Sequence, residues 1–281
     1  MNPVYGLATA ASIATFGLNR WDVRVIGAHH IPTTGPMVLA TNHVGYLDFV
    51  FVGYGARERG RRIRFVAKRE VFDNPAVGPL MRAMDHIRVD RGGNTRVAMR
   101  EVAAALAAGD AVGMFPEGTI SRSYVPLAGR PGAARMAIDA GAPLVPGAVW
   151  GSQRIFTKGR SFRMAPRTAV RVAYGPAIET APGDDPTEVH SRLMAAIGAL
   201  VDDLQRTYPQ RPAGPSDAWW QPAHLGGTAP TPEEAEARAR ADAERRREAA
   251  RPTEPRAADT ERRPAAGPPG DPDAIDADRH G

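Results

Sequence analysis

A histidine and an aspartate five positions apart are the residues of this sequence best suited to chemistry. His43 and Asp48 follow an apolar run at positions 37–40 and adjoin a second apolar segment at positions 46–54. Such a place, between a strand and a helix, is where α/β proteins expose functional groups. An aspartate bonded to one imidazole nitrogen fixes the tautomer, so the other nitrogen can take a proton from a hydroxyl. The spacing alone fits equally an aspartate that caps a helix beside an incidental histidine.

A second candidate turn follows the apolar run Ala111–Phe115. Glu117, Gly118 and Thr119 form a polar turn directly after Pro116. Glycine lets the backbone approach a ligand closely, and Arg122, three residues further, can pair with phosphate. An ordinary surface turn has the same composition.

A third candidate lies between Lys68 and Arg91. Lys68 follows the apolar residues 65–67, and Arg91 comes two positions after Val89. Pro75 and Gly78 stand between the two cations. Cations at strand ends can cradle a phosphate, but a solvated basic face has the same pattern.

Short apolar runs alternate with helical patterns through the first two thirds of the chain. This alternation predicts an α/β fold with a mostly parallel central sheet flanked by helices. Strands are expected around residues 23–26 and 37–40 and over 63–67, 87–89, 111–115, 144–149 and 169–173. Helices are expected over 46–54, 94–108 and 132–140, and an amphipathic helix opens at Asp185-Pro186, where Asp185 can cap it.

Composition divides the chain into four segments. Residues 1–20 carry no charge before Arg20 and predict an apolar helix, which either packs on the core or lies in a membrane interface. We assign residues 21–208 to the catalytic domain and residues 209–225 to a segment in which Trp219 and Trp220 dock on the domain or contact a membrane. Residues 226–281 are rich in Pro, Ala, Arg and Glu, which predicts a disordered tail.

The charge and the missing cysteines limit the chemistry. The 281 residues carry a net charge of +5 and no cysteine. Disulfides, thiolate metal sites and a cysteine acyl-enzyme are therefore excluded. The excess of cations lies in residues 1–208 and predicts a phosphate-bearing partner, either lipid or nucleic acid. Five arginines between positions 56 and 68 are a candidate contact for anionic headgroups, and no nucleic-acid-binding module is evident.

Together the three candidate sites resemble the motifs of the 1-acylglycerol-3-phosphate (lysophosphatidic acid) acyltransferase family, also called the phospholipid/glycerol acyltransferase family. Its Asn-His-x4-Asp motif matches Asn42, His43 and Asp48, and its Phe-Pro-Glu-Gly-Thr motif matches Phe115–Thr119. A Lys, a spaced Pro and Gly, and a Val-Asp-Arg ending match Lys68 to Arg91, and an apolar run closing on Val-Pro matches 144–146. The resemblance covers roughly residues 27–175, and four ordered motifs make it specific.

The resemblance implies a glycerolipid acyltransferase-like fold and direct acyl transfer. His43 would be the general base held by Asp48. The residues implied to bind the acceptor and its phosphate are Lys68, Arg91, Glu117, Gly118, Thr119 and Arg122. Two departures bear on this, because Ile120-Ser121 separate Arg122 from Thr119, and Arg130 stands where relatives often have a lysine.

The resemblance also implies the partners. An acyl thioester, acyl-CoA or acyl carrier protein, would be the donor and a lysophospholipid the acceptor, with no cofactor, no metal and no nucleic acid. The enzyme would bind an anionic membrane surface, peripherally or monotopically, at the cytoplasmic face of the cell membrane. Alternative acceptors are glycerol-3-phosphate, another lysophospholipid and a lipid-linked sugar. A non-catalytic basic lipid-binding module is the alternative outside enzymes.

Overall fold

Seven strands form one sheet at the centre of the computed structural model, which describes residues 3–90 and 95–249. Most of them fall on the apolar runs of the sequence, and β2, β6 and β7 are buried on both faces. The strands are β1 (Asp22–Ile26), β2 (Met37–Thr41), β3 (Ile63–Lys68), β4 (Ile87–Val89), β5 (Ala111–Met114), β6 (Leu144–Trp150) and β7 (Ala169–Tyr174).

The helices alternate with these strands as expected. The α-helices are α1 (Pro3–Leu18), α2 (Asp48–Ala56), α3 (Arg69–Asp73), α4 (Gly78–Ala83), α5 (Thr95–Ala107), α6 (Gly132–Ala140), α7 (Pro186–Arg206) and α8 (Pro232–Ala249). The 3₁₀ helices are η1 (Ala28–His30), η2 (Arg57–Arg59), η3 (Ser152–Arg154), η4 (Pro215–Trp220) and η5 (Ala223–Leu225). At α7 the predicted cap is confirmed, because the Asp185 side chain accepts a hydrogen bond from the Thr187 backbone N–H.

The strand order is β1-β7-β6-β2-β5-β3-β4. Strands β6, β2, β5, β3 and β4 run parallel to one another, whereas β7 is antiparallel to β6 and parallel to β1. The predicted mostly parallel α/β sheet is therefore confirmed. Parallel strands end at one edge of a sheet, so the segments that follow β2, β3, β4 and β5 emerge side by side.

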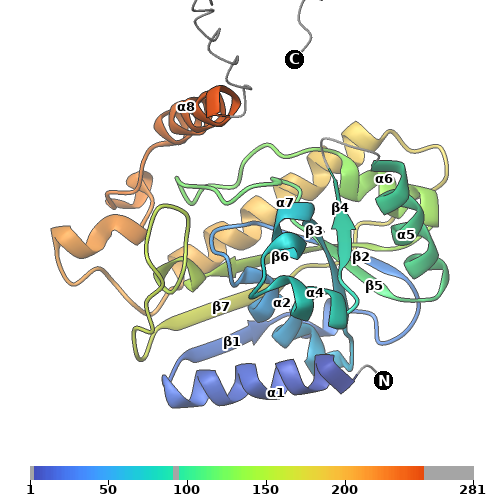
Figure 1. Ribbon diagram of the computed structural model, residues 1–281, viewed down its shortest axis with the longest axis horizontal. Helices are drawn as coiled ribbons and strands as arrows, with labels where there is room; N and C mark the ends of the chain where they lie inside the picture. Colours follow the sequence, from blue (N-terminus) through green and yellow to red (C-terminus); the bar gives the residue numbers. More distant parts are fainter. Residues whose placement is uncertain (1–2, 91–94, 250–281) are drawn as a thin grey trace, which may run out of the picture. The chain divides into compact units, whose positions relative to one another are not determined.

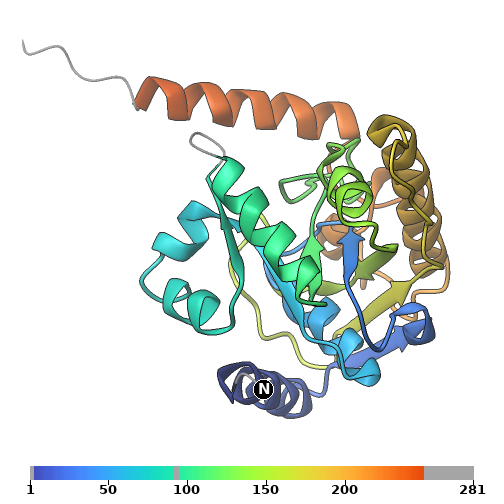
Figure 2. The ribbon, with the colours of Figure 1, turned by 90° about the vertical axis from the view of Figure 1, so that its right-hand side faces the viewer.

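Helices cover both faces of the sheet (Figures 1 and 2). Helices α5, α6 and α7 line one face, where α6 contacts β2 and α7 contacts β6 and β7. On the other face α2 contacts β1, β3, β6 and β7. The core lies between these layers and includes Leu39, Phe51, Leu144 and Leu193, none of which is exposed. The strand that leads to His43, β2, is therefore buried between the helical layers.

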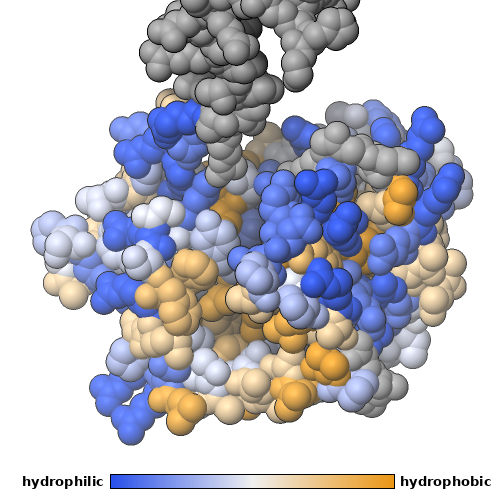
Figure 3. Space-filling model, in the orientation of Figure 1, coloured by the Kyte–Doolittle hydropathy of each residue, from blue (hydrophilic) through white to orange (hydrophobic). Residues whose placement is uncertain are grey.

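Helix α1 packs on the domain through one side only. Phe16 is buried and stacks on Phe51, with ring centroids 5.1 Å apart. By contrast, Leu7 and Leu18 are 72% and 86% exposed. Apolar side chains gather along the part of the face where α1 lies and around a hollow above it (Figure 3). The helix therefore joins the core and also presents apolar side chains at the surface. No helix within residues 3–90 and 95–249 is both long and apolar enough to cross a membrane.

The segment after α7 folds back on the domain. Trp219 and Trp220 are 8% and 2% exposed, which favours docking over membrane contact for both indoles. Arg160 lies over the Trp219 ring at 3.9 Å, and Arg154 lies over the Trp220 ring at 4.5 Å. These contacts bind the segment to the connection between β6 and β7.

The predicted tail contains one described helix. The described residues through Arg238 form one compact unit, and those from Ala239 to Ala249 belong to a second. Helix α8 begins at Pro232, inside the stretch predicted to be disordered, where Glu and Arg recur four residues apart. Residues 250–281, the rest of that stretch, lie outside the described residues.

Two arginines of the predicted headgroup contact serve the fold instead. Arg61 is 8% exposed and donates hydrogen bonds to the carbonyls of Gly35 and Gly109. Arg64 pairs with Asp110 at 3.0 Å. Buried, carbonyl-bound guanidinium groups are poorly placed to bind headgroups, so the patch is smaller than the sequence indicated.

Candidate active site

The site begins where β2 ends, at Asn42. The Asn42 side chain accepts a hydrogen bond from the Val149 N–H at 2.7 Å and donates one to the Val149 carbonyl at 3.1 Å. Asn42 is 1% exposed, so these bonds satisfy a buried amide that would otherwise be costly. They join the end of β2 to β6 and fix the point from which His43 leaves the sheet.

His43 is held on three sides. Its Nδ1 lies 2.9 Å from Oδ2 of Asp48, and its ring stacks on Phe115 with centroids 4.1 Å apart. Its backbone N–H donates to Glu117 at 2.7 Å, and its carbonyl accepts the Ser121 N–H at 2.8 Å. With Nδ1 turned to the carboxylate, Nε2 is the ring nitrogen left for a substrate proton.

Asp48 is the first residue of α2 and is fully buried. Its Oδ2 accepts the backbone N–H groups of Val44 at 2.7 Å and Gly45 at 2.8 Å as well as facing His43. Asp48 therefore closes the turn before α2 and also contacts the imidazole, whereas no side chain caps the helix itself. Gly45 is required there, since a Cβ would lie 2.9 Å from the Phe156 carbonyl oxygen.

Glu117 supports the same turn from the neighbouring strand. Its Oε1 accepts the His43 N–H and its Oε2 accepts the Leu127 N–H at 3.0 Å. Burial raises the pKa of this carboxyl to about 8, the two backbone hydrogen bonds oppose the shift, and the charge of Asp48 adds to it. Both carboxyl oxygens are therefore engaged by backbone N–H groups, which gives Glu117 a supporting contact that the sequence did not predict.

The remaining residues of the turn after β5 lie around Glu117. Gly118 takes the left-handed conformation with φ +67°, and its N–H donates to the Phe115 carbonyl. Thr119 Oγ1 lies 3.5 Å from Nζ of Lys158, and Arg122 is partly exposed next to Ser121. A cation the sequence did not single out thus joins the predicted turn.

Lys68 belongs to β3, one of the outer strands of the sheet. Lys68 ends β3 and is paired in register with Val89 of β4, two strands away from β2. It lies on the same sheet edge as His43 and Glu117, but no hydrogen bond joins it to either. Arg91 lies outside the described residues.

Three site residues come from a segment that the sequence motifs do not include. Ser152 Oγ donates to Oδ1 of Asp48 at 2.5 Å, and Thr157 Oγ1 donates to the Val44 carbonyl at 2.7 Å. Lys158 approaches Thr119, as above. The one available signal was Lys158 itself, because the chain has only two lysines and uses arginine elsewhere. Among the described residues, no group of three or more histidine, aspartate or glutamate side chains could hold a metal ion.

Known proteins resemble this chain in sequence and in fold. The sequence profile of the Acyltransferase family matches residues 22–150. A 1-acyl-sn-glycerol-3-phosphate acyltransferase of Bacillus subtilis (strain 168) is 31% identical over 144 residues, which cover 50% of this chain and 70% of the relative. The chain belongs to the Acyltransferase family. Because this acyltransferase is an enzyme of that family, the non-catalytic lipid-binding alternative is wrong.

Two further proteins, one compared by sequence and one by structure, are similar to this chain. The 1-acyl-sn-glycerol-3-phosphate acyltransferase alpha of Bos taurus is 29% identical to this acyltransferase over 205 residues, 70% of each chain. The crystal structure of the 1-acyl-sn-glycerophosphate (LPA) acyltransferase PlsC from Thermotoga maritima matches with a TM-score of 0.61 and 22% identity, covering 73% of this chain and 81% of that one. The structural match confirms the fold expected from the four motifs.

Proposed function

We propose that this acyltransferase moves a fatty acyl group from acyl-CoA or acyl carrier protein to the free hydroxyl of 1-acylglycerol-3-phosphate. The names of the relatives from Bacillus subtilis and Bos taurus support this acceptor. The observation that carries the chemistry is the bond from His43 Nδ1 to the fully buried Asp48. A buried carboxylate holds the imidazole in one tautomer and stabilises its protonated form, which a general base requires.

The proposed transfer accounts for the proton and for each bond that forms or breaks. His43 Nε2 takes the proton from the acceptor hydroxyl as the oxygen attacks the thioester carbonyl carbon. The resulting tetrahedral intermediate collapses, the C–S bond breaks, and the leaving thiolate recovers the proton from the imidazolium. The products are 1,2-diacylglycerol-3-phosphate and the free thiol of the carrier. The chain has no cysteine, so no cysteine acyl-enzyme enters this scheme.

We assign the acceptor phosphate to cations of the active site. The sequence proposes Lys68, Arg91 and Arg122, and we add Lys158, because its Nζ lies beside Thr119. A lysine or arginine supplies charge-assisted hydrogen bonds to phosphate oxygens. Glu117 is assigned a supporting role, because its oxygens already accept two backbone N–H groups.

We further propose that the enzyme works at the surface of a bilayer, as a peripheral or monotopic protein at the cytoplasmic face. Its acceptor is a lipid, so the site must meet a membrane. The exposed apolar side chains Leu7, Ile13 and Leu18 of α1 support a contact of this helix with the interface. Flotation with phosphatidylglycerol liposomes tests this, and absence of the protein from the floated fraction at low salt would refute it.

A panel of acceptors tests the substrate. Purified enzyme is supplied with palmitoyl-CoA or palmitoyl-acyl carrier protein and with equal concentrations of four acceptors: 1-acylglycerol-3-phosphate, glycerol-3-phosphate, a choline lysophospholipid and a lipid-linked sugar. We expect the highest kcat/KM with 1-acylglycerol-3-phosphate. A higher kcat/KM with any other acceptor would replace the proposed substrate by that one. The comparison of the two thioesters identifies the donor.

A further inference from the structure

The connection between β6 and β7 places a buried hydroxyl next to the His43–Asp48 pair, the dyad. Gly151, directly after β6, has φ +99°, and a Cβ there would lie 2.1 Å from the Ala169 carbonyl oxygen. Only glycine fits such a turn. The turn places Ser152, which has no exposed surface, with its Oγ 2.5 Å from Oδ1 of Asp48.

The two oxygens of the Asp48 carboxylate have separate partners. Oδ2 faces the imidazole and accepts the N–H groups of Val44 and Gly45. Oδ1 accepts the Ser152 hydroxyl, the one hydrogen-bond donor that it has within the part of the chain that the structure describes. Without that donor, a buried carboxylate oxygen would be left unsatisfied, and the carboxylate could rotate away from Nδ1.

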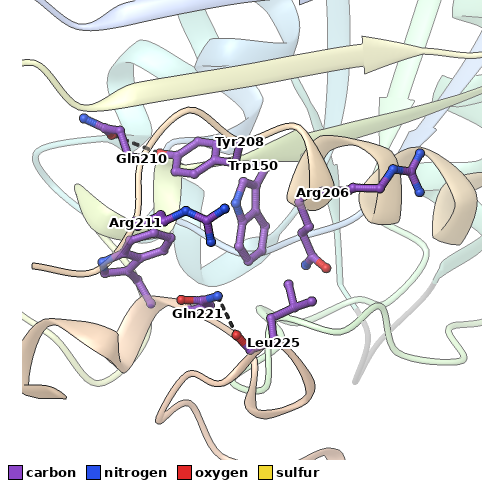
Figure 4. Close-up of a pocket in the computed structure, with 9 residues that line it drawn as sticks. Trp150, Arg206, Tyr208, Gln210, Arg211, Gln221 and Leu225 are labelled. Carbon is purple, nitrogen blue, oxygen red and sulfur yellow. Dashed lines mark hydrogen bonds between the residues drawn. The ribbon is translucent and has the colours of Figure 1, made fainter. Parts of the chain in front are cut away.

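The turn that carries Ser152 is held by the segment after α7 (residues 209–225), which contains Trp219 and Trp220. The next residue, Gln153, accepts the Gly151 N–H at 2.8 Å and donates to the Trp220 carbonyl at 3.2 Å. Trp220 lines a small cavity with Trp150 and Tyr208, and Figure 4 shows these last two rings close together beside Gln221 and Leu225. The segment thus fixes the turn that carries Ser152.

The same connection is bonded to the turn that carries His43. The Phe156 carbonyl accepts the Tyr46 N–H at 2.9 Å, and Thr157 Oγ1 donates to the Val44 carbonyl. Phe156 and Thr157, like Ser152 and Gln153, lie outside the stretch 22–150 that matches the family profile. Part of the support for the dyad therefore comes from a segment that the family motifs do not include.

We propose that Ser152 is a positioning residue for acyl transfer. Its hydroxyl fixes the rotation of the Asp48 carboxylate, so that Oδ2 stays aligned with His43 Nδ1 while the imidazole gains and loses a proton. Hydrogen bonds to a buried charged group are strong enough to set such an orientation. The proposal rests on the proposed roles of His43 and Asp48, and Ser152 acts through Asp48 without touching substrate.

A double-mutant cycle tests the proposal kinetically. We expect Ser152→Ala to lower kcat about tenfold or more and to leave the KM for the lipid acceptor within about twofold. In the Asp48→Asn background the same change should lower kcat less than about twofold, because its target is already removed. Thr168→Val is the matched control, since it deletes another buried hydroxyl at the end of the same connection. Among the described residues, that hydroxyl donates to the Ala165 carbonyl alone.

The cycle can also overturn the proposal. A Ser152→Ala enzyme within about twofold of wild type, or an equal loss in both Asp48 backgrounds, would show that Ser152 serves packing only. If Ser152→Ala does not fold, Ser152→Cys replaces it in the same cycle, because cysteine keeps a weak donor at nearly the same volume.

A second readout needs no substrate. The Nδ1 proton of His43, bonded to a carboxylate, should give a proton NMR signal downfield of the amides that is absent from His43→Gln. We expect Ser152→Ala to shift or abolish this signal and Thr168→Val to leave it unchanged. An unchanged signal in Ser152→Ala would overturn the proposal. If wild-type enzyme transfers no acyl group to any acceptor, the proposed function fails, and this measurement still decides the role of Ser152.

Discussion

The imidazole of His43 and the carboxylate of Asp48 meet through a single oxygen, with Nδ1 2.9 Å from Oδ2, and that oxygen also accepts two backbone N–H groups. The aspartate therefore organises the turn and the base together. A substitution at Asp48 acts on both, whereas a substitution at His43 removes only the proton acceptor. The predictions below separate these contributions.

Asp48→Asn should lower kcat about 10²- to 10⁴-fold. An amide can still accept a backbone N–H, but it can also present its NH₂ to the ring and so favour the wrong tautomer. Steady-state kinetics with the preferred acceptor measures the loss, and circular dichroism checks the fold. A folded variant with the wild-type rate would leave Asp48 with only its structural role in the turn.

Gly45→Ala should lower kcat by about 10²-fold with only a modest loss of stability. The added Cβ would approach the Phe156 carbonyl oxygen to 2.9 Å and Oδ1 of Asp48 to 3.2 Å. The turn must then move by a few tenths of an ångström, and small displacements of catalytic groups are costly. Gly198→Ala in α7 is the control for an added methyl group, because its backbone is helical and nothing lies within 4 Å of a Cβ there. Equal rates in the Gly45 and Gly198 variants would contradict this account of the turn.

Glu117→Gln should change the pH dependence of stability. The pKa of Glu117 is raised to about 8 in the folded protein, so between its ordinary value of 4.5 and about 8 the folded state binds the proton that the unfolded state has lost. The free energy of unfolding of wild type should therefore fall as pH rises across this window, and the glutamine variant should lack this fall. Urea unfolding of both proteins at pH 5 and pH 8 measures it. A stability difference that stays constant with pH would argue against a buried, proton-binding Glu117.

His86 should make the folded protein less stable as the pH falls below 6.5. Burial lowers its pKa from 6.5 to about 4, and its Nδ1 accepts the Phe65 N–H at 3.0 Å, which requires an unprotonated nitrogen. Between pH 6.5 and 4 the unfolded state binds a proton that the folded state does not, so this contribution to stability is lost as pH falls. His86→Asn should reduce the acid-induced loss by about 2–3 kcal/mol at pH 4. Identical pH profiles for wild type and variant would contradict the prediction.

The sequence predicted the sheet well because strands that are buried on both faces consist mainly of apolar residues. All seven strands coincide with the predicted ranges to within about a residue at each end, and α6 has the predicted bounds, Gly132–Ala140. The order of the strands is not written in those runs, yet it brings the ends of β2 and β5 together and so joins His43 to Glu117. The family resemblance implied that both residues serve one site, but it did not predict the hydrogen bond between them.

The remainder of the site could not be predicted from the sequence. Ser152 is 104 positions from Asp48, and a serine after an apolar strand has no pattern that marks its partner. Glu117 has the residue type of a ligand, and only its burial between two backbone N–H groups reveals a supporting role. The docking of Trp219 and Trp220 likewise depends on arginines from another part of the chain.

The rate of acyl transfer to 1-acylglycerol-3-phosphate by His43→Ala, compared with wild type under saturating palmitoyl-CoA, tests the central claim most directly. We predict a fall in kcat of about 10³-fold or more, with unchanged thermal unfolding, because the general base is removed and Asp48 still closes its turn. A folded His43→Ala protein that turns over within about tenfold of wild type would contradict the assignment of His43 as the base.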